Sequence, residues 1–328
     1  MIVRGKWIKN AEPGTTVSEV AVESVRLRLE AVWHYLPLAS KKAYEDTEYV
    51  HQLRVATRRA NAALQIYGKL LPRKRVKAIT KELRRIRKAA GDARDLDVLA
   101  MRLGEELLGN EQSNLGFVLD EIAAFRKRAQ KPLVTIHRHA KRTGFKKRCR
   151  KLVKRLRWRG ESREPTFLDF SRGSMRPLVD DFFAAASEDL SEIAALHQMR
   201  IKGKRVRYAM ELLSGAFEPS FRGELYPVFA EVQSKLGTIN DHAVAIATLG
   251  AWSERAKKRK SRVELAQLVA NEKSQLESHC QQFRDWWTDD RISALASQFD
   301  RALHEAPPNR PLQEDELPSP DPVNQNYP

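Results

Sequence analysis

Histidine and cationic side chains that occur twice at one spacing are the residues best suited to chemistry. Residues 50–67 read VHQLRVATRRANAALQIY, and residues 196–213 read LHQMRIKGKRVRYAMELL. The matching pairs, 146 residues apart, are His51 and His197, Gln52 and Gln198, Arg54 and Arg200, and Arg59 and Arg205. Arginine donates forked hydrogen bonds to phosphate oxygens, and lysine and histidine add donors and charge. The pattern therefore favours a phosphate-rich polyanion as ligand.

Helices must present these side chains, because at about 100° per residue each segment has one cationic and one apolar side. The first cationic side carries His51, Arg54 and Arg58, opposite Leu53, Ala56, Ala60, Ala63, Leu64 and Tyr67. The second carries His197, Arg200, Lys204 and Arg207, opposite Met199, Val206, Met210 and Leu213. A charged side is usually only solvated, but solvated surfaces mix the two signs. The recurrence of cations therefore predicts a ligand surface on both helices.

A second basic helix is predicted over 74–90, with Gly91 as its C-cap. Its apolar seam is Val76, Ile79, Leu83, Ile86 and Ala90, and its cationic row is Lys77, Lys81, Arg84 and Lys88. In the second copy Arg84 aligns with Ala230 and Lys88 with Ser234, so the two copies differ in charge. The longest basic run, residues 137–159, holds 12 Lys or Arg and no acid. Its sequence alone leaves open whether this run is a solvated face or part of the binding surface.

Metal binding is the alternative for the repeated histidines and for a short acidic motif. His51 and His197 lie on different predicted helices with no cysteine nearby, which disfavours a zinc site. Asp92, Asp95 and Asp97 resemble a metal motif, but only Asp95 recurs, as Asp241. We therefore expect Asp95 to cap the next helix or to pair with an arginine, and we expect neither a metal nor a cofactor.

Charge and composition limit the possible partners and setting. Lys and Arg number 59 against 42 Asp and Glu, a formal net charge of +17, which favours nucleic acid, an acidic membrane surface or inorganic phosphate chains. Hydrophobic residues make up 42% of the chain, enough for a real core. No apolar run is long enough to span a bilayer. Cys149 and Cys280 are too few and too distant for a disulfide framework, which predicts a reducing, cytoplasmic setting.

The periodicity predicts an all-α protein in two similar halves. The predicted helices of the first half cover about 16–37, 50–70, 74–90, 115–130 and 132–159, and the second half repeats the scheme to about 304. Residues 1–14 are predicted to be an N-terminal extension, 160–177 a loop between halves, and 305–328 a disordered Pro-rich tail.

Two pairs of motifs resemble the CHAD domain, the conserved histidine α-helical domain. HQLRVATRR followed by GDARDLDVL resembles its first half, and LHQMRIKGKRVRYAMELL followed by LGTINDHAVA resembles its second. The resemblance covers about 15–304, with halves at about 15–160 and 178–304. It implies two four-helix bundle halves related by a pseudo-twofold, with basic grooves meeting at a central cavity. It also implies polyphosphate binding through His51, Arg54, Arg58, Lys81, Arg84, Lys88, His197, Arg200, Lys204 and Arg207.

We therefore expect a non-enzymatic binder of inorganic polyphosphate, recruited to or organising polyphosphate granules. One alternative is a nucleic-acid-binding protein, and weak non-specific binding of nucleic acid fits the charge. However, only Tyr208 and Trp158 lie near basic faces, whereas single-strand binders interleave aromatic and basic residues. The other alternative is a metal-dependent polyphosphate or triphosphate hydrolase, which is disfavoured because the chain lacks an E-x-E-x-K motif, a P-loop and a convincing carboxylate pair.

Overall fold

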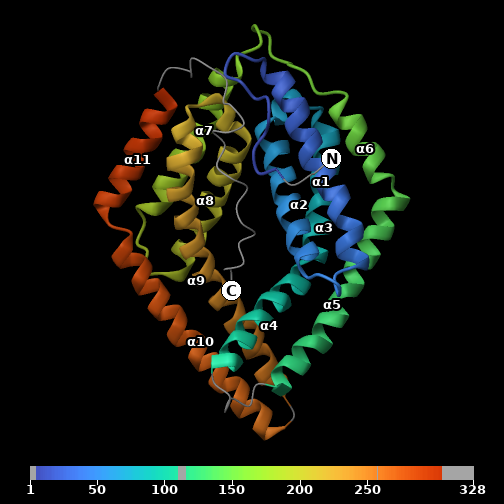
Figure 1. The fold of residues 1–328 in the computed structure, drawn as a ribbon, viewed down its shortest axis with the longest axis vertical. Coiled ribbons are helices and arrows are strands. Elements are labelled where there is room, and N and C mark those ends of the chain that lie inside the picture. The colour runs from blue at the N-terminus through green and yellow to red at the C-terminus, as the bar shows by residue number, and fades with distance from the viewer. Residues whose placement is uncertain (1–4, 110–115, 257, 305–328) are drawn as a thin grey trace. The chain divides into compact units, whose positions relative to one another are not determined.

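The computed structural model describes residues 5–109, 116–256 and 258–304, and within them every regular element is helical (Figure 1). An isolated antiparallel bridge joins Thr16 to Thr166. The predicted all-α class is confirmed, whereas the pseudo-twofold and the central cavity stay predictions. None of the described helices combines the length and the apolar composition that a membrane crossing needs. The chain divides into two compact units.

The first unit contains the described residues up to Ser171, together with Glu211–Ala216. Its helices are α1 (Val17–Lys41), α2 (Glu48–Ile66), α3 (Arg73–Ala89), α4 (Gly91–Gly109), α5 (Gly116–Arg142) and α6 (Phe145–Val153). The helix α1 begins at a capping box, in which the Thr16 and Glu19 side chains satisfy backbone donors of the first turn. It packs along α2 through buried residues that include several alanines of α2, and these small side chains allow a close approach.

The second unit contains most of α7 and α8, and all of α9, α10 and α11. Their bounds are α7 (Phe167–Ala186), α8 (Ile193–Leu213), α9 (Tyr226–Arg255), α10 (Arg259–Trp286) and α11 (Asp289–His304). Aromatic rings fill its core: Phe229 stacks edge-on against Phe182, with ring centres 4.9 Å apart, and against Phe299 at 5.6 Å. A short π-helix, Phe221–Leu225, leads directly into α9. The long helix α9 therefore covers in one piece the positions that α3 and α4 cover in the first copy.

Two predicted boundaries in the first copy were wrong. The predicted helices 115–130 and 132–159 are instead one helix, α5, that continues through Pro132, and a separate α6. The break falls at Gly144, whose φ of 62° lies in the left-handed region that glycine adopts without strain. Gly91 is not a C-cap: Ala90 caps α3, and Gly91 is the first residue of α4.

The predicted loop over 160–177 was wrong from residue 167 onward. The helix α7 begins at Phe167 and includes Pro177. Its start is fixed by Thr166, whose hydroxyl accepts a hydrogen bond from the Asp169 backbone N–H at 3.1 Å and donates one to the Asp169 carboxylate at 2.7 Å. Burial of Phe167, Met175 and Val179 along one side then stabilises the helix despite its glycine and proline. The predicted tail, 305–328, lies outside the described residues.

Candidate polyanion-binding site

The helix α2 separates apolar and cationic residues as its sequence predicted. All six predicted apolar residues are buried, among them Leu53 and Ala60 with no exposed surface. On the other side His51, Arg54 and Arg58 are half-buried. This partial burial arises because α2 also packs against α3 and α4, whose ends lie beside the cationic row. The row is therefore a partly desolvated surface and not a fully solvated face.

The side chain of Arg54 lies over the junction between α3 and α4. Its Nη1 donates a hydrogen bond to the Ala90 carbonyl at 3.3 Å, and its Nη2 lies 3.6 Å from Oδ1 of Asp95. A Cβ added to Gly91 would come within 3.3 Å of Nη1, so a glycine at this position leaves room for the guanidinium. Of the two roles expected for Asp95, pairing with an arginine is confirmed, whereas capping is not, because Asp95 is the fifth residue of α4.

The charges around His51 and Arg54 come from three helices. Burial is the main cause that lowers the pKa of His51 to about 3, and the charges of Arg94, Arg58, Arg54 and Arg59 lower it further. Burial also lowers the pKa of Arg54, with Asp95 opposing and with Arg58, Arg94 and Arg87 adding to the effect. Arg94 of α4 and Arg87 of α3 also belong to this cluster but were not among the predicted site residues.

The positions of Arg94 and Arg87 in the sequence could have indicated that they belong to the site. Arg94 stands one position before Asp95 in GDARDLDVLA, and Arg87 flanks the predicted row of α3. At the 146-residue offset they align with Asn240 and Gln233, so the second copy lacks both charges. We call His51, Arg54, Arg58, Arg87 and Arg94 the α2 cluster.

The neighbouring arginines Arg58 and Arg59 have different surroundings. Arg58 forms no hydrogen bond or ion pair with any described residue, and its Nε is buried. Arg59 instead donates a hydrogen bond from Nε to Oε2 of Glu211 at 2.6 Å, and the Glu211 side chain is only 1% exposed. Arg59 therefore compensates a buried carboxylate, whereas the charge of Arg58 stays available to a ligand.

The row on α3 also lies where the sequence predicted it. Ile79, Leu83 and Ile86 are buried, and the opposite row, Lys77, Lys81, Arg84 and Lys88, is exposed. None of these four cations forms an ion pair with an acid of the described chain. Arg87 lies on the α2 side of this row, where its charge acts on Arg54. The first copy therefore brings the predicted residues of α2 and α3 onto adjoining helix faces.

In the second copy, α8 carries the matching row in its own unit. Its apolar residues Met199, Val206 and Met210 are buried, while Arg200, Lys204 and Arg207 are half-buried and His197 is exposed. Arg207 lies over the Tyr208 ring at 5.2 Å. Lys202 lies off the row and forms an ion pair with Asp181 at 2.9 Å.

Close packing of α8 on α9 depends on Gly203. A Cβ there would come within 2.0 Å of Nε2 of Gln233 and within 3.2 Å of Phe182. The acid that corresponds to Asp95, Asp241, accepts a hydrogen bond from Nδ2 of Asn240 at 3.2 Å. The second copy thus repeats the cationic row but replaces the charges around it with amides.

Within the part of the chain that the structure describes, no group of three or more His, Cys, Asp and Glu side chains could hold a metal ion. Asp97, the third acid of the motif, lies 2.5 Å from Nε of Arg126. Asp95 and Asp97 therefore both pair with arginines.

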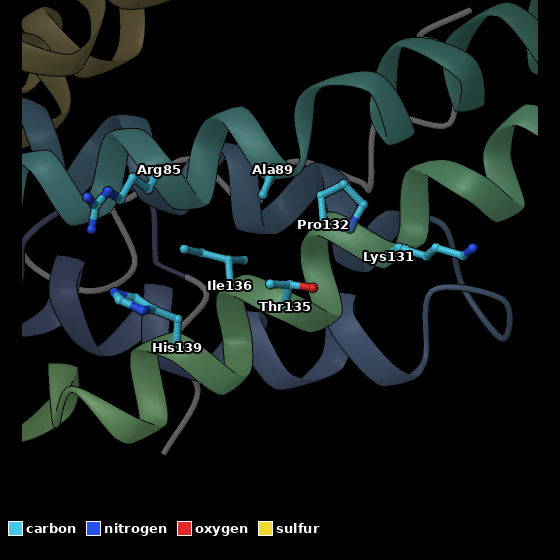
Figure 2. Close-up of a pocket in the computed structure, with 7 residues that line it drawn as sticks. All are labelled: Arg85, Ala89, Lys131, Pro132, Thr135, Ile136 and His139. Carbon is cyan, nitrogen blue, oxygen red and sulfur yellow. The ribbon is translucent and has the colours of Figure 1, made fainter.

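A groove of about 610 Å³ lies between α3 and α5, outside the predicted site residues (Figure 2). Apolar and small side chains line its middle, and Arg85 and His139 lie together at one end with Lys131 at the other. The lining residues are Arg85, Ala89, Lys131, Pro132, Thr135, Ile136 and His139. The groove adjoins the basic row of α3 at Arg85.

The paired helical copies and their His–Arg rows define a class of all-α, two-repeat basic domains. The chain belongs to the CHAD domain family, whose model matches residues 23–250. It is similar to the crystal structure of the CHAD domain from the plant Ricinus communis, with 21% identity, a TM-score of 0.63, and coverage of 93% of this chain and 98% of that one. It is also similar to PptA from Streptomyces chartreusis, with 18% identity, a TM-score of 0.59, and coverage of 83% and 99%. At these identities the two structures support the fold alone. A search of curated proteins found no match.

Proposed function

We propose that this protein binds inorganic polyphosphate, without turning it over, through the α2 cluster, the α3 row and the α8 row. The observation that carries the proposal is the α2 cluster, in which Arg58 has no acid partner and Arg54 has one at 3.6 Å. Membership of the CHAD family agrees with this ligand. A flexible chain of phosphates needs donors and positive charge along its path, and these rows supply both.

A binding role without catalysis fits the acids near the rows. Hydrolysis or transfer of phosphate needs carboxylates that hold Mg²⁺ beside the substrate. Asp95 and Asp97 are each engaged by an arginine, at 3.6 Å and 2.5 Å. We therefore propose that the protein organises polyphosphate, or is recruited to it, in cytoplasmic granules.

Nucleic acid is the second candidate for a surface of this charge. Single-strand binders stack bases on exposed aromatic rings between basic residues. Tyr208 is only 5% exposed and lies under Arg207, and the indole N–H of Trp158 donates to the Ser162 carbonyl at 2.8 Å. Tyr208 is thus too buried to stack a base beside the α8 row, and Trp158 belongs to none of the three proposed rows, so we rank polyphosphate above nucleic acid.

The test compares long-chain polyphosphate, single-stranded DNA and ATP in direct binding titrations over a range of salt concentrations. We expect polyphosphate to bind tightest per phosphate, with an affinity that falls steeply with salt through counterion release. The variant with Arg54→Glu, Arg58→Glu, Arg200→Glu and Lys204→Glu should lose this binding while its helical circular dichroism stays unchanged.

The matched control reverses four cations of the second unit that lie outside the α8 row: Arg259→Glu, Lys273→Glu, Arg284→Glu and Arg301→Glu. It changes the net charge equally, so it separates a specific surface from a general charge effect. Equal loss of binding in both variants would contradict the proposed site. Tighter binding of DNA than of polyphosphate, or sustained phosphate release with Mg²⁺, would contradict the proposed function.

A further inference from the structure

The basic run 137–159 divides into buried and exposed parts. His137 is buried, and its Nδ1 lies 2.6 Å from the Ser40 hydroxyl, so this residue belongs to the core. Exposed cations lie at the end of α5, on α6 and just after it. We call seven of those on and after α6 the α6 surface: Lys146, Lys147, Arg150, Lys151, Lys154, Arg155 and Arg157.

The α6 surface shares with the α3 row a lack of paired acids. On α1, by contrast, Arg26 pairs with Glu23 and Glu30 of the same helix. None of the seven cations of the α6 surface forms an ion pair with a described acid. Neighbouring like charges at i,i+4 destabilise a helix, and a bound polyanion would relieve that repulsion.

Contacts on both edges of α6 determine the rotation of this helix about its own axis. Phe145, Cys149 and Leu152 are buried against the rest of the unit. At one edge Lys146 lies 5.5 Å from the ring centre of Trp33 on α1. At the other edge Arg148 lies 3.9 Å from the Glu82 carboxylate of α3. The cations between these two edges therefore point away from the unit, and those next to Arg148, such as Lys151, lie toward α3.

Glu82 joins the α6 surface to the row of α3. This carboxylate is buried and lies near three side chains: Arg85 at 3.6 Å, the His139 ring at 3.4 Å and Arg148 at 3.9 Å. Arg85 stands on the same helix as the α3 row, next to Arg84, and is half-exposed. Figure 2 shows Arg85 and His139 together at one end of the α3–α5 groove. Positive side chains thus continue from α3 across this junction to α6.

The opposite edge of α3 meets the α2 cluster through Arg87. The helix α3 therefore lies between two basic surfaces, and its own row connects them. Apolar insertion into a membrane is not available to α6, because its apolar side is already buried in the unit. The ligand that could contact both basic surfaces at once is an extended, flexible polyanion that crosses α3.

We propose that a long polyphosphate chain bound at the α2 cluster continues over α3 and the Arg85–His139–Arg148 junction onto the α6 surface. This inference rests on the proposed function and adds a chain-length requirement to it. A chain that covers only the part of α2 from residue 51 to residue 58, about 11 Å, does not reach α6. Affinity should therefore increase with chain length beyond that span.

The test measures the affinity of the whole protein for a short polyphosphate, of about the length of α2 from residue 51 to residue 58, and for long-chain polyphosphate. The variant is Lys147→Glu, Lys151→Glu and Lys154→Glu. We expect its affinity for the long chain to fall at least about tenfold at low salt, with a smaller salt slope, because fewer counterions are released. Its affinity for the short chain should change less than about twofold, since that chain does not use these contacts.

Two further variants keep the result interpretable. Arg259→Glu, Lys273→Glu and Arg301→Glu together change the net charge equally and should leave both affinities unchanged. Replacing the three α6 lysines by glutamine removes charge without reversing it and should give a smaller loss for the long chain. Circular dichroism and thermal unfolding check that each variant is folded.

The possible outcomes separate this inference from the proposed function. If the α6 variant keeps full long-chain affinity while Arg54→Glu and Arg58→Glu together abolish it, the α6 surface is not part of the path and the proposed function stands. If the wild-type protein binds neither chain, the proposed function itself is wrong. If the α6 variant loses duplex DNA binding but not polyphosphate binding, the α6 surface serves nucleic acid and the inference is overturned.

Discussion

The carboxylate of Asp95 lies 3.6 Å from the guanidinium of Arg54, across the junction where α3 ends and α4 begins. The Asp95 side chain is 44% exposed, so solvent weakens this pair. The same carboxylate lies beside the cations that we propose for polyphosphate. A ligand phosphate and Asp95 would therefore compete for Arg54.

Asp95→Asn should tighten binding of polyphosphate. The amide removes a negative charge next to the ligand but can still hydrogen bond, so we expect affinity to rise about two- to tenfold, in the range of one exposed charge contact. The free energy of unfolding should change by less than about 1 kcal/mol. Calorimetric titration and thermal unfolding measure the two effects. Loss of binding would instead give Asp95 a direct role in holding the ligand.

Binding should strengthen as pH falls, through His51. In the free protein the pKa of His51 is lowered to about 3 by burial and by the charges of Arg94, Arg58, Arg54 and Arg59. A bound polyanion compensates those charges, which raises the pKa and causes proton uptake on binding. Affinity should therefore increase between pH 7.5 and pH 5.5, and His51→Gln should flatten this dependence. An unchanged pH profile in the variant would exclude His51 as the titrating group.

The same histidine should make the free protein less stable in acid. Its ordinary pKa of 6.5 applies to the unfolded chain, so between about pH 6.5 and pH 3 the unfolded state binds more protons than the folded state. The free energy of unfolding should thus fall as pH drops through this range. Denaturant unfolding of wild type and His51→Gln at several pH values measures this contribution, and a smaller pH slope in the variant is expected.

Arg58→Ala and Arg59→Ala should affect different properties although the residues are neighbours. Arg58 has no partner in the described chain, so its removal should weaken polyphosphate binding about tenfold or more, the range of one charge-assisted contact. Its effect on stability should be small. Arg59→Ala leaves Glu211 buried without its 2.6 Å partner and should lower the free energy of unfolding by about 3 kcal/mol. Binding and chemical denaturation of both variants test this, and the reverse result would exchange the two roles.

Gly203→Ala should destabilise the second unit. The added Cβ would lie 2.0 Å from Nε2 of Gln233 and 3.2 Å from Phe182, and Gln233 is only 5% exposed, so its displacement is restricted. We expect a loss of about 1–3 kcal/mol, as for overpacking. The control is Gly250→Ala in α9, where no atom lies within 4 Å and where alanine should stabilise the helix by about 0.5–1 kcal/mol. A neutral Gly203→Ala would show that α8 and α9 adjust easily.

The helices that carry the rows were predictable because each has one apolar side. Burial of Leu53 and Ala60 opposite Arg54 follows from the period of the sequence, and the same holds for α3 and α8. The boundaries were less predictable. Pro132 does not end α5, and the start of α7 depends on the Thr166–Asp169 hydrogen bonds, a signal that the glycine and proline nearby obscured.

Contacts between residues far apart in the sequence could not be predicted, because helical periodicity reports only which residues share a face of one helix. The ion pair between Arg59 and Glu211 joins residues 152 positions apart, and the influence of Arg94 on His51 depends on how α4 packs beside α2. A count of charges in the sequence does not distinguish Arg59 from Arg94. Their roles differ because their burial and their neighbouring acids differ.

The two copies of the repeat share residue types at matched positions, but the matched residues do not have the same roles. Arg59 stabilises a buried acid whereas its copy Arg205 is exposed, and His51 is half-buried among arginines whereas its copy His197 faces solvent. Transferring a ligand contact from one copy to the other by alignment would therefore assign the wrong task to at least two of the matched positions. Each copy must be mutated and measured separately.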